Sequence, residues 1–329
     1  MSIEYAKTFV GHDSRAERLL SCGLLPDQEN DSKRRTTMRV VLTGGTGYIG
    51  SAVLDRLVSR NHQVTAVVRS DAKAEQVRAK GADPAIADLA DGDALAKLAD
   101  NSDGVIHLAS PGDETSAAVD EAAVSSFLSA LRNTGRPFVY TTGVWLHGSG
   151  AAITEATDMN PPRLATWRVP LATRVRQAQG VRTSVVAPAV VYGHGGGLLN
   201  LVAAGPRTAG ATPALTMIGH GDQHWTTVHV DDLAELYVLA LEKAPAASYF
   251  VGASGENPTV RELTEAVSRS VGMAGRVEPE PVVQTLDRLG LLGEALLLDQ
   301  RASGDTARQV LGWSPTGPSV LDDIARTTF

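Results

Sequence analysis

Three of the four glycines in residues 43–50 (Thr-Gly-Gly-Thr-Gly-Tyr-Ile-Gly), namely Gly44, Gly47 and Gly50, have the spacing of a loop that binds phosphate groups. The first can adopt the positive φ of a tight turn, and the second lets backbone N–H groups approach a pyrophosphate. The third lets a following helix pack closely against the preceding strand, and the N-terminus of that helix attracts an anion. We therefore predict dinucleotide binding by Gly44, Thr46, Gly47, Tyr48, Ile49 and Gly50.

The flanking elements support this prediction. Residues 39–42 are a short apolar run typical of a buried parallel strand, and apolar residues recur at helical spacing over 52–58. Residues 62–69 indicate a second strand. This order makes a βαβ unit of about thirty residues, with the glycines where a phosphate would lie.

The end of the second strand indicates which nicotinamide cofactor fits. NAD-binding units of this type place Asp or Glu there, to accept a hydrogen bond from the ribose 2′-OH. Here the strand ends at Arg69 and Ser70, with no carboxylate. Arg69 can pair with a 2′-phosphate, an interaction worth about 1.5–3 kcal/mol, and Ser70 can add a contact. The alternative is that Arg69 is an ordinary solvated arginine. The pattern favours NADP(H) over NAD(H).

From about Met38 to the C-terminus the sequence resembles the short-chain dehydrogenase/reductase superfamily, particularly its extended and atypical branches of the epimerase/dehydratase kind. The loop TGGTGYIG carries this resemblance together with residues 87–89, 105–109, 138–142, 184–193, 225–234 and 307–315. It implies an α/β fold with a doubly wound parallel (Rossmann) sheet and a smaller C-terminal substrate-binding region. It also implies further cofactor-binding positions at Asp88, Leu89, Leu108, Ala109 and Pro188.

The chain departs from that superfamily at the catalytic centre. Most members use a Tyr-x-x-x-Lys pair, and none of the six tyrosines here has a lysine four residues later. Counting back from residues 191–193 places the tyrosine position near Leu164 and the lysine position near Arg168. Arg168 can bind ribose and a carbonyl oxygen, but it is a poor proton donor. The usual hydroxyl position falls on Gly143, and the adjacent Thr142 is either the oxyanion partner or a threonine that caps a turn.

Five histidines and two of their neighbours are candidates for site or structural roles. His147 and His194 fall in loops that the resemblance places around the substrate, so each is either a proton donor near pH 7 or a surface histidine. Trp225, His229 and Asp232 are expected to be structural. A metal site at His220, His224 and His229 is disfavoured, because alternation along a strand would point them in different directions. No metal site is predicted.

We expect three regions along the chain. Residues 1–37 are polar and are predicted to be a disordered extension. Residues 38–192 are predicted to be the NAD(P)-binding domain, and residues 193–329 the substrate-binding and closing region, whose late strands return to the sheet. Within the last region we expect a flexible loop over 193–199, a helix around 201–204, a strand-like segment over 215–219 and a helix-like one over 283–298. Its apolar residues and few charges suggest a small hydrophobic or aromatic carbonyl compound as substrate.

Composition excludes several other classes of protein. The 329 residues carry a net charge of −7 without a basic patch, so a nucleic-acid partner is not expected. No apolar stretch reaches the ~18 residues of a membrane span. A single cysteine, Cys22, excludes an internal disulfide, and we expect a cytoplasmic protein. The resemblance implies a homodimer.

The leading hypothesis is an NADPH-dependent oxidoreductase that transfers a hydride to a carbonyl or conjugated double bond of a small apolar substrate. One alternative is a non-catalytic NADP(H)-binding redox sensor, which would need neither the tyrosine nor the lysine. The other is a nucleotide-sugar epimerase or dehydratase, which would want arginines for the diphosphate.

Overall fold

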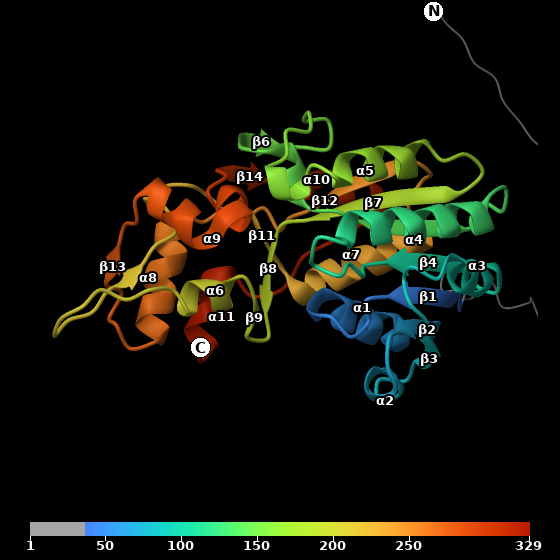
Figure 1. Ribbon diagram of the computed structural model, residues 1–329, viewed down its shortest axis with the longest axis horizontal. Helices are drawn as coiled ribbons and strands as arrows, with labels where there is room; N and C mark the ends of the chain where they lie inside the picture. The colour runs from blue at the N-terminus through green and yellow to red at the C-terminus, as the bar shows by residue number, and fades with distance from the viewer. Residues whose placement is uncertain (1–36) are drawn as a thin grey trace, which may run out of the picture. The chain divides into compact units, whose positions relative to one another are not determined.

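A seven-stranded parallel sheet is the centre of the computed structural model, which describes residues 37–329 (Figure 1). From one edge to the other its strands are β3 (Asp83–Ile86), β2 (Gln63–Val68), β1 (Arg39–Thr43), β4 (Gly104–His107), β5 (Pro137–Thr141), β7 (Arg182–Pro188) and β12 (Ser248–Gly252). The strand order reverses between β1 and β4. This is the doubly wound parallel sheet that the sequence predicts, and ligands bind at such a reversal, beyond the carboxyl ends of the strands.

Helices cover both faces of the sheet, because right-handed crossovers leave β1 and β4 in opposite directions. One layer contains α1 (Tyr48–Ser59) packed against α7 (Val230–Lys243). In the other layer α4 (Ser116–Leu131) packs against α3 (Gly92–Asp100) and α5 (Arg168–Gln177). The short helix α2 (Asp71–Arg78) connects β2 to β3.

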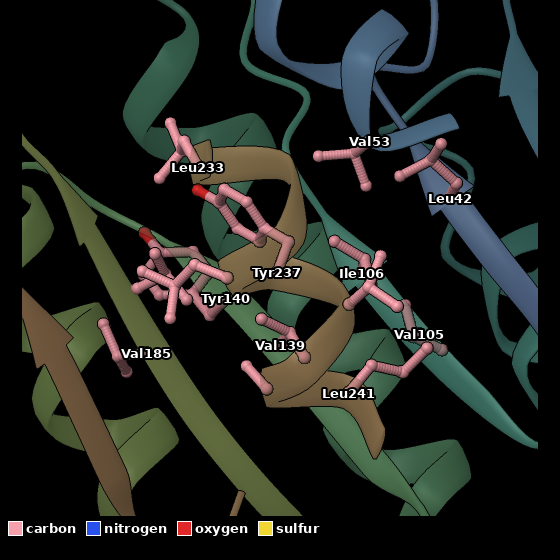
Figure 2. Packing of buried hydrophobic residues seen from close by; sticks show 14 of the residues in the cluster. Leu42, Val53, Val105, Ile106, Val139, Tyr140, Val185, Leu233, Tyr237 and Leu241 are labelled. Atoms are coloured by element: carbon pink, nitrogen blue, oxygen red, sulfur yellow. The ribbon is translucent and has the colours of Figure 1, made fainter. Parts of the chain in front are cut away.

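The main hydrophobic core lies between the sheet and these helices (Figure 2). Leu233, Tyr237 and Leu241 recur at four-residue intervals on α7, so they share one helix face, and all three are fully buried. Val105 and Ile106 of β4 belong to the same cluster. Side chains of this size stabilise the fold by about 1.5–3 kcal/mol each when fully buried.

A second, smaller hydrophobic core packs around Tyr192, Leu263 and Leu296. Outside the main sheet the strands form three small sheets, namely β8 (Val190–Gly193) with β9 (Gly196–Gly197) and β11 (Thr227–His229), β10 (Leu215–Thr216) with β13 (Val277–Glu278), and β6 (Gly150–Ile153) with β14 (Gln300–Ala302). The remaining helices are η1 (Val144–His147), η2 (Arg163–Ala165), α6 (Leu199–Ala203), α8 (Val260–Ser270), α9 (Val282–Leu296), α10 (Asp305–Leu311) and α11 (Val320–Arg326). Strand β12 returns from this part of the chain to the main sheet. Residues 37–329 form one compact unit, so the boundary near residue 192 stays a prediction.

Some element boundaries differ from the sequence-based expectations. The resemblance places the end of the third strand at residues 87–89, whereas β3 ends at Ile86 and Asp88 and Leu89 follow it. The strand-like segment over 215–219 is a strand only at its first two residues. Helix α9 is interrupted by non-helical backbone at Gly290, since glycine readily adopts its positive φ. The extension predicted for residues 1–37 lies outside the described residues except at Thr37. Within residues 37–329, no helix is long and apolar enough to cross a membrane.

Candidate functional site

The glycine loop makes the close turn that its sequence predicts. Gly44 has a φ of +77°, and a Cβ there would lie 2.9 Å from the backbone nitrogen of Ala109. A Cβ at Gly50 would lie 2.0 Å from the carbonyl oxygen of Gly44, where no side chain fits. Half-buried Thr46 lies in the same turn. Glycine at both positions therefore allows α1 to begin this close to β1 and β4.

The N-terminus of α1 is open to an anion. Its N-cap residue, Gly47, provides no side-chain hydrogen bond, and the first turn contains no acidic side chain. Gly47 is also exposed, and a Cβ there would meet only the Gly44 carbonyl oxygen, at 3.3 Å. Free N–H groups and the helix dipole fit a pyrophosphate. The Tyr48 hydroxyl donates a 2.7 Å hydrogen bond to the carbonyl oxygen of Gly193, which ties the loop to β8.

The residues expected near the adenosine lie along one edge of the sheet. Strands β2 and β3 pair in parallel up to their last residues, so Arg69 and Asp88 follow neighbouring strand ends. Both are exposed, whereas Leu89 is buried. The Ser70 hydroxyl oxygen accepts a hydrogen bond from the backbone N–H of Lys73 at 3.4 Å and caps α2, which leaves its own hydrogen available to a ligand.

A cavity of about 910 Å³ lies beyond the carboxyl ends of β5 and β7. Of the residues predicted for the site, its lining includes Tyr48, Ile49, Thr142, Arg168 and Pro188. Leu164 and Gly143, the positions at which the superfamily has its tyrosine and its hydroxyl, line it as well. The rest of the wall is largely apolar and includes Val144, Trp145, Leu146, Trp167, Leu198 and Leu291.

Thr142 presents an unsatisfied hydroxyl in this cavity. Its backbone N–H donates to the carbonyl oxygen of Val186 at 2.9 Å, which fixes the residue at the end of β5. Its Oγ1 atom is buried and has no hydrogen-bond partner within residues 37–329. Because a buried hydroxyl without a partner is unfavourable, this atom is placed to bond a ligand. The alternative turn-capping role is not observed.

Arg168 brings a positive charge to the same cavity from the first residue of α5. Its Nη1 atom donates a long, 3.4 Å hydrogen bond to the carbonyl oxygen of Thr141 and lies 3.5 Å from Oδ2 of Asp120. Its guanidinium also stacks on the ring of Trp167, 4.2 Å from the centroid. These contacts hold the cation while leaving part of it open to a ligand.

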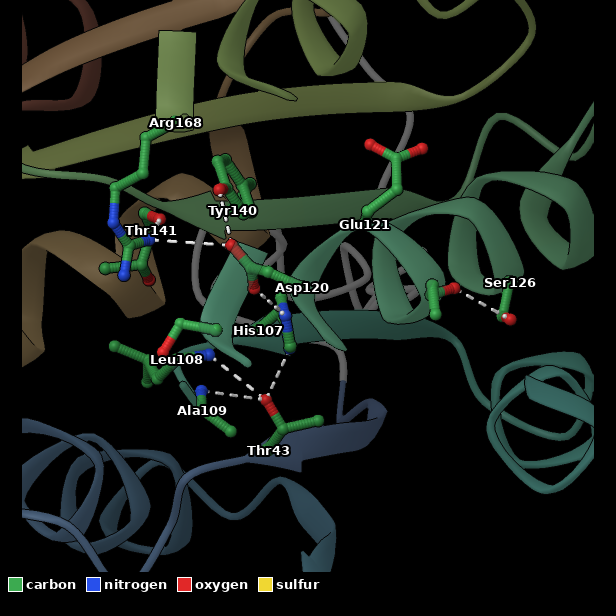
Figure 3. Close-up of polar contacts among 12 residues, drawn as sticks. Thr43, His107, Leu108, Ala109, Asp120, Glu121, Ser126, Tyr140, Thr141 and Arg168 are labelled. Atoms are coloured by element: carbon green, nitrogen blue, oxygen red, sulfur yellow. Dashed lines mark hydrogen bonds and ion pairs between the residues drawn. The ribbon is translucent and has the colours of Figure 1, made fainter. Parts of the chain in front are cut away.

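Asp120 is the buried centre of a polar network that the sequence did not reveal (Figure 3). Its carboxylate accepts 2.8 Å hydrogen bonds from Nε2 of His107 and from the hydroxyl of Tyr140. Burial, and next the Asp120 charge, raise the pKa of Tyr140, so this phenol stays a hydrogen-bond donor. The carboxylate thus ties Arg168 of the cavity to β4 and β5.

The other end of the network reaches the glycine loop. Thr43 Oγ1 accepts hydrogen bonds from the backbone N–H groups of Leu108 and Ala109, both at 3.1 Å. It also lies 2.7 Å from Nδ1 of His107. With two donors already on this oxygen, its own hydrogen is directed to Nδ1, so His107 donates from Nε2 to Asp120. The predicted cofactor positions Leu108 and Ala109 are thereby fixed against β1.

One sequence signal could have identified Asp120. It lies on the apolar face of its helix, since Ala123, Val124, Phe127 and Leu131 follow at helical spacing and are all fully buried. A carboxylate on a buried face requires partners. Only the fold shows that these are His107 and Tyr140.

The structure does not bring His147 or His194 to the cavity. His147 is buried, with Nδ1 2.9 Å from the carbonyl oxygen of Thr157 and Nε2 3.1 Å from the hydroxyl of Tyr249. Burial lowers its pKa, which disfavours the protonated form that a donor would need. His194 is exposed in the turn after β8 and pairs with Asp231, 2.9 Å away. Neither imidazole lines the cavity.

The residues expected to be structural make structural contacts. Trp225 Nε1 donates to the carbonyl oxygen of Leu296 at 3.0 Å. Nδ1 of His229 accepts from the backbone N–H of Asp231 at 3.3 Å and caps α7. The Asp232 carboxylate accepts 2.9 Å hydrogen bonds from the backbone N–H groups of residues 316 and 317.

A doubly wound parallel sheet, a glycine loop at its reversal and a cavity beyond its strand ends define a Rossmann-type dinucleotide-binding protein. The sequence model of the NAD dependent epimerase/dehydratase family matches residues 40–252. The chain belongs to this family of NAD(P)-dependent enzymes, as its resemblance to the extended short-chain dehydrogenases implies.

Three similar proteins differ in the activity that their names describe. The chain is 30% identical over 320 residues to a UDP-glucose 4-epimerase of Mycolicibacterium smegmatis, covering 88% of this chain and 97% of that protein. It is 28% identical over 284 residues to a 2-alkyl-3-oxoalkanoate reductase of Stenotrophomonas maltophilia, covering 79% and 83%. A crystal structure of the UDP-glucose 4-epimerase of Thermus thermophilus in complex with NAD superimposes with a TM-score of 0.67 at 22% identity, over 88% of this chain and 98% of that one. The last likeness concerns the fold alone.

Proposed function

We propose that the protein is an NADP(H)-dependent reductase that acts on a carbonyl group or a conjugated double bond of a small apolar substrate. The observation that carries the proposal is the buried hydroxyl of Thr142, unpartnered within the described residues, beside the Arg168 cation in a largely apolar cavity. A nicotinamide bound along the glycine loop would supply the hydride to the substrate.

Thr142 and Arg168 act on the substrate oxygen. The Thr142 hydroxyl donates a hydrogen bond to this oxygen, and the guanidinium stabilises the negative charge that develops on it. Arginine retains its own proton and Thr142 keeps its hydroxyl hydrogen, so the product oxygen takes its proton from solvent water in the cavity. Asp120 holds the guanidinium at the cavity wall and balances its charge.

The cavity wall favours an apolar substrate over a nucleotide-sugar. A diphosphate is best bound by arginines free to pair with it. Of the arginines on the wall, Arg163 pairs with Glu294 and Arg168 with Asp120. The reductase of Stenotrophomonas maltophilia supports this choice, because its name specifies an oxo group on an alkyl-substituted acid.

Each alternative has an observation in its favour. The Mycolicibacterium smegmatis relative favours a nucleotide-sugar epimerase. The replacement of the family tyrosine position by Leu164 favours a redox sensor that binds the cofactor without turnover. A reductase differs from both because it consumes NADPH in proportion to the substrate reduced.

The choice of cofactor rests on Arg69, and fluorescence titrations with NADPH and NADH test it. Arg69→Ala should weaken NADPH binding about ten- to a hundredfold, the equivalent of one lost charge-assisted contact, and leave NADH binding unchanged. Arg78→Ala, at an exposed arginine of nearby α2 that pairs only with Glu75 within the described residues, is the control. Equal binding of both cofactors to the wild-type protein would refute the assignment.

The reaction is tested by NADPH oxidation with aliphatic ketones, aryl ketones and enones, and with UDP-glucose as the competing substrate. Thr142→Val should lower kcat about a hundredfold without weakening NADPH binding, because it removes a single oxyanion donor. Thr183→Val is a matched control, since the Thr183 hydroxyl is also buried without a partner within the described residues but lies outside the cavity. NADPH binding without oxidation by any carbonyl compound would favour the sensor instead.

A further inference from the structure

Two imidazoles and one carboxylate meet next to the glycine loop but outside the cavity. One nitrogen of His194, one nitrogen of His229 and one carboxylate oxygen of Asp231 all lie within 4.8 Å of one another. Within the described part of the chain, no other group of three or more His, Cys, Asp or Glu residues has this geometry. The cluster shares only His229 with the trio of His220, His224 and His229, which alternation along a strand disfavours as a metal site.

The turn after β8 and the start of α7 bring these side chains together. His194 lies in that turn, and its Nε2 is 2.9 Å from Oδ2 of Asp231. His229 ends β11, and its Nδ1 is 3.8 Å from the same oxygen. In a tetrahedral metal site with bonds of about 2.0–2.2 Å, neighbouring ligand atoms are separated by distances comparable to these two. Small movements of the side chains would therefore bring all three ligand atoms into range of one metal ion.

His229 is the buried member of the cluster. It is 5% exposed, and its Nδ1 accepts the backbone N–H of Asp231 at 3.3 Å, the bond that caps α7. A metal ion bound at Nδ1 would take over the lone pair that accepts this N–H.

The two imidazole rings also pack together. Their centroids are 5.5 Å apart with the rings near edge-on, and the Tyr192 ring packs edge-on against His229. The first turn of α7 carries two carboxylates, those of Asp231 and Asp232. This negative charge favours a divalent cation.

We propose that His194, His229 and Asp231 bind a first-row divalent transition metal, with water completing the coordination. Nitrogen and carboxylate ligands of this number fit Zn²⁺. The metal would fasten the turn after β8 to the N-terminus of α7. Because Tyr48 is hydrogen-bonded to Gly193, the last residue of β8 and the neighbour of His194, the metal would also stiffen one side of the cofactor loop. This proposal does not depend on the proposed reaction.

Zn²⁺ titration by calorimetry tests the site. The full chain, freed of any polyhistidine tag and of metal by chelation, should bind one Zn²⁺ per chain with a rise in Tm. His194→Asn and Asp231→Asn should each weaken that binding about tenfold or more. Asparagine suits position 194 because it tolerates the positive φ of 52° found there. His220→Asn, at another exposed histidine, is the matched control and should bind like the wild type.

Two outcomes would overturn the metal site. Absence of saturable one-to-one binding would show that His194 and Asp231 form only an exposed ion pair. Equal affinities for the wild type and His194→Asn would show that Zn²⁺ binds elsewhere. NADPH binding, measured on the same metal-free samples, reports on the cofactor site separately, so failure of one proposal is distinguishable from failure of the other.

Discussion

Asp120→Asn tests whether the buried carboxylate supports the cavity. Asparagine keeps one oxygen to accept from His107, but it loses the negative charge that faces Tyr140 and Arg168. A hydrogen bond to a charged group is worth about 1.5–3 kcal/mol, and the 3.5 Å pair with partly exposed Arg168 adds about 1 kcal/mol or less. The asparagine amide can regain part of this by donating to Tyr140. We expect a loss of about 2–3 kcal/mol in the free energy of unfolding.

Urea unfolding and steady-state kinetics on the same samples measure this effect. The expected loss corresponds to a fall in Tm of about 5–10 °C. If Arg168 acts on the substrate, kcat should also fall while the KM for NADPH stays near its wild-type value. Glu121→Gln is the control, because the adjacent Glu121 is exposed, pairs with Arg174 at the surface and should change stability by less than about 1 kcal/mol. An Asp120→Asn protein as stable as that control would refute the reasoning.

Four further substitutions, one of them a control, address the loop and a buried histidine. Gly50→Ala should abolish NADPH binding, because its Cβ would lie 2.0 Å from the carbonyl oxygen of Gly44 in the loop. Gly45→Ala is the control. Its Cβ would meet only side-chain carbons, the nearest a methyl group of Leu42 at 3.2 Å, so its NADPH affinity should stay within a few fold of wild type. Tyr48→Phe should lose about 0.5–1.5 kcal/mol of stability in urea, since it removes the hydrogen bond to Gly193. Burial lowers the pKa of His147, so below about pH 6.5 the unfolded chain takes up a proton that the folded protein does not. Stability should therefore fall as the pH drops, and His147→Gln should lose less stability between pH 7.5 and 5.5 than the wild type.

For each of these expectations, one measured result would contradict the reasoning. NADPH binding by Gly50→Ala at wild-type affinity would contradict the close approach of α1 to β1. A Tyr48→Phe protein of unchanged stability would show that the tether to β8 is unimportant. Equal pH dependence of stability in the wild type and His147→Gln would contradict the neutral, buried state of that histidine.

The parts of the fold that local sequence determines were predictable. Gly44 and Gly50 are separated by only six residues, and their steric roles follow from the strand and helix that flank them. Arg168 and Leu164 were placed at the cavity by counting along the chain from a later strand. Both line it in the structure.

Long-range contacts were not predictable in the same way. Thr43 and His107 are 64 residues apart and meet only because β1 and β4 are neighbours in the sheet. His147 falls in a loop that borders the site, but loop position does not determine where a side chain points, and its ring turns instead toward Tyr249. His194 similarly turns to the surface. Sequence thus located the cofactor loop and the cavity better than the polar groups that serve them.

Isotope transfer tests the central claim most directly. NADPH carrying deuterium at C4 of the nicotinamide would be incubated with the protein and an apolar ketone that it accepts, and the product analysed by mass spectrometry. A reductase predicts alcohol that carries one deuterium, formed in equal amount to NADP⁺, when the label is on the transferred face. No consumption of NADPH with either labelled face across the ketones and enones, together with interconversion of UDP-glucose and UDP-galactose, would contradict the proposed function.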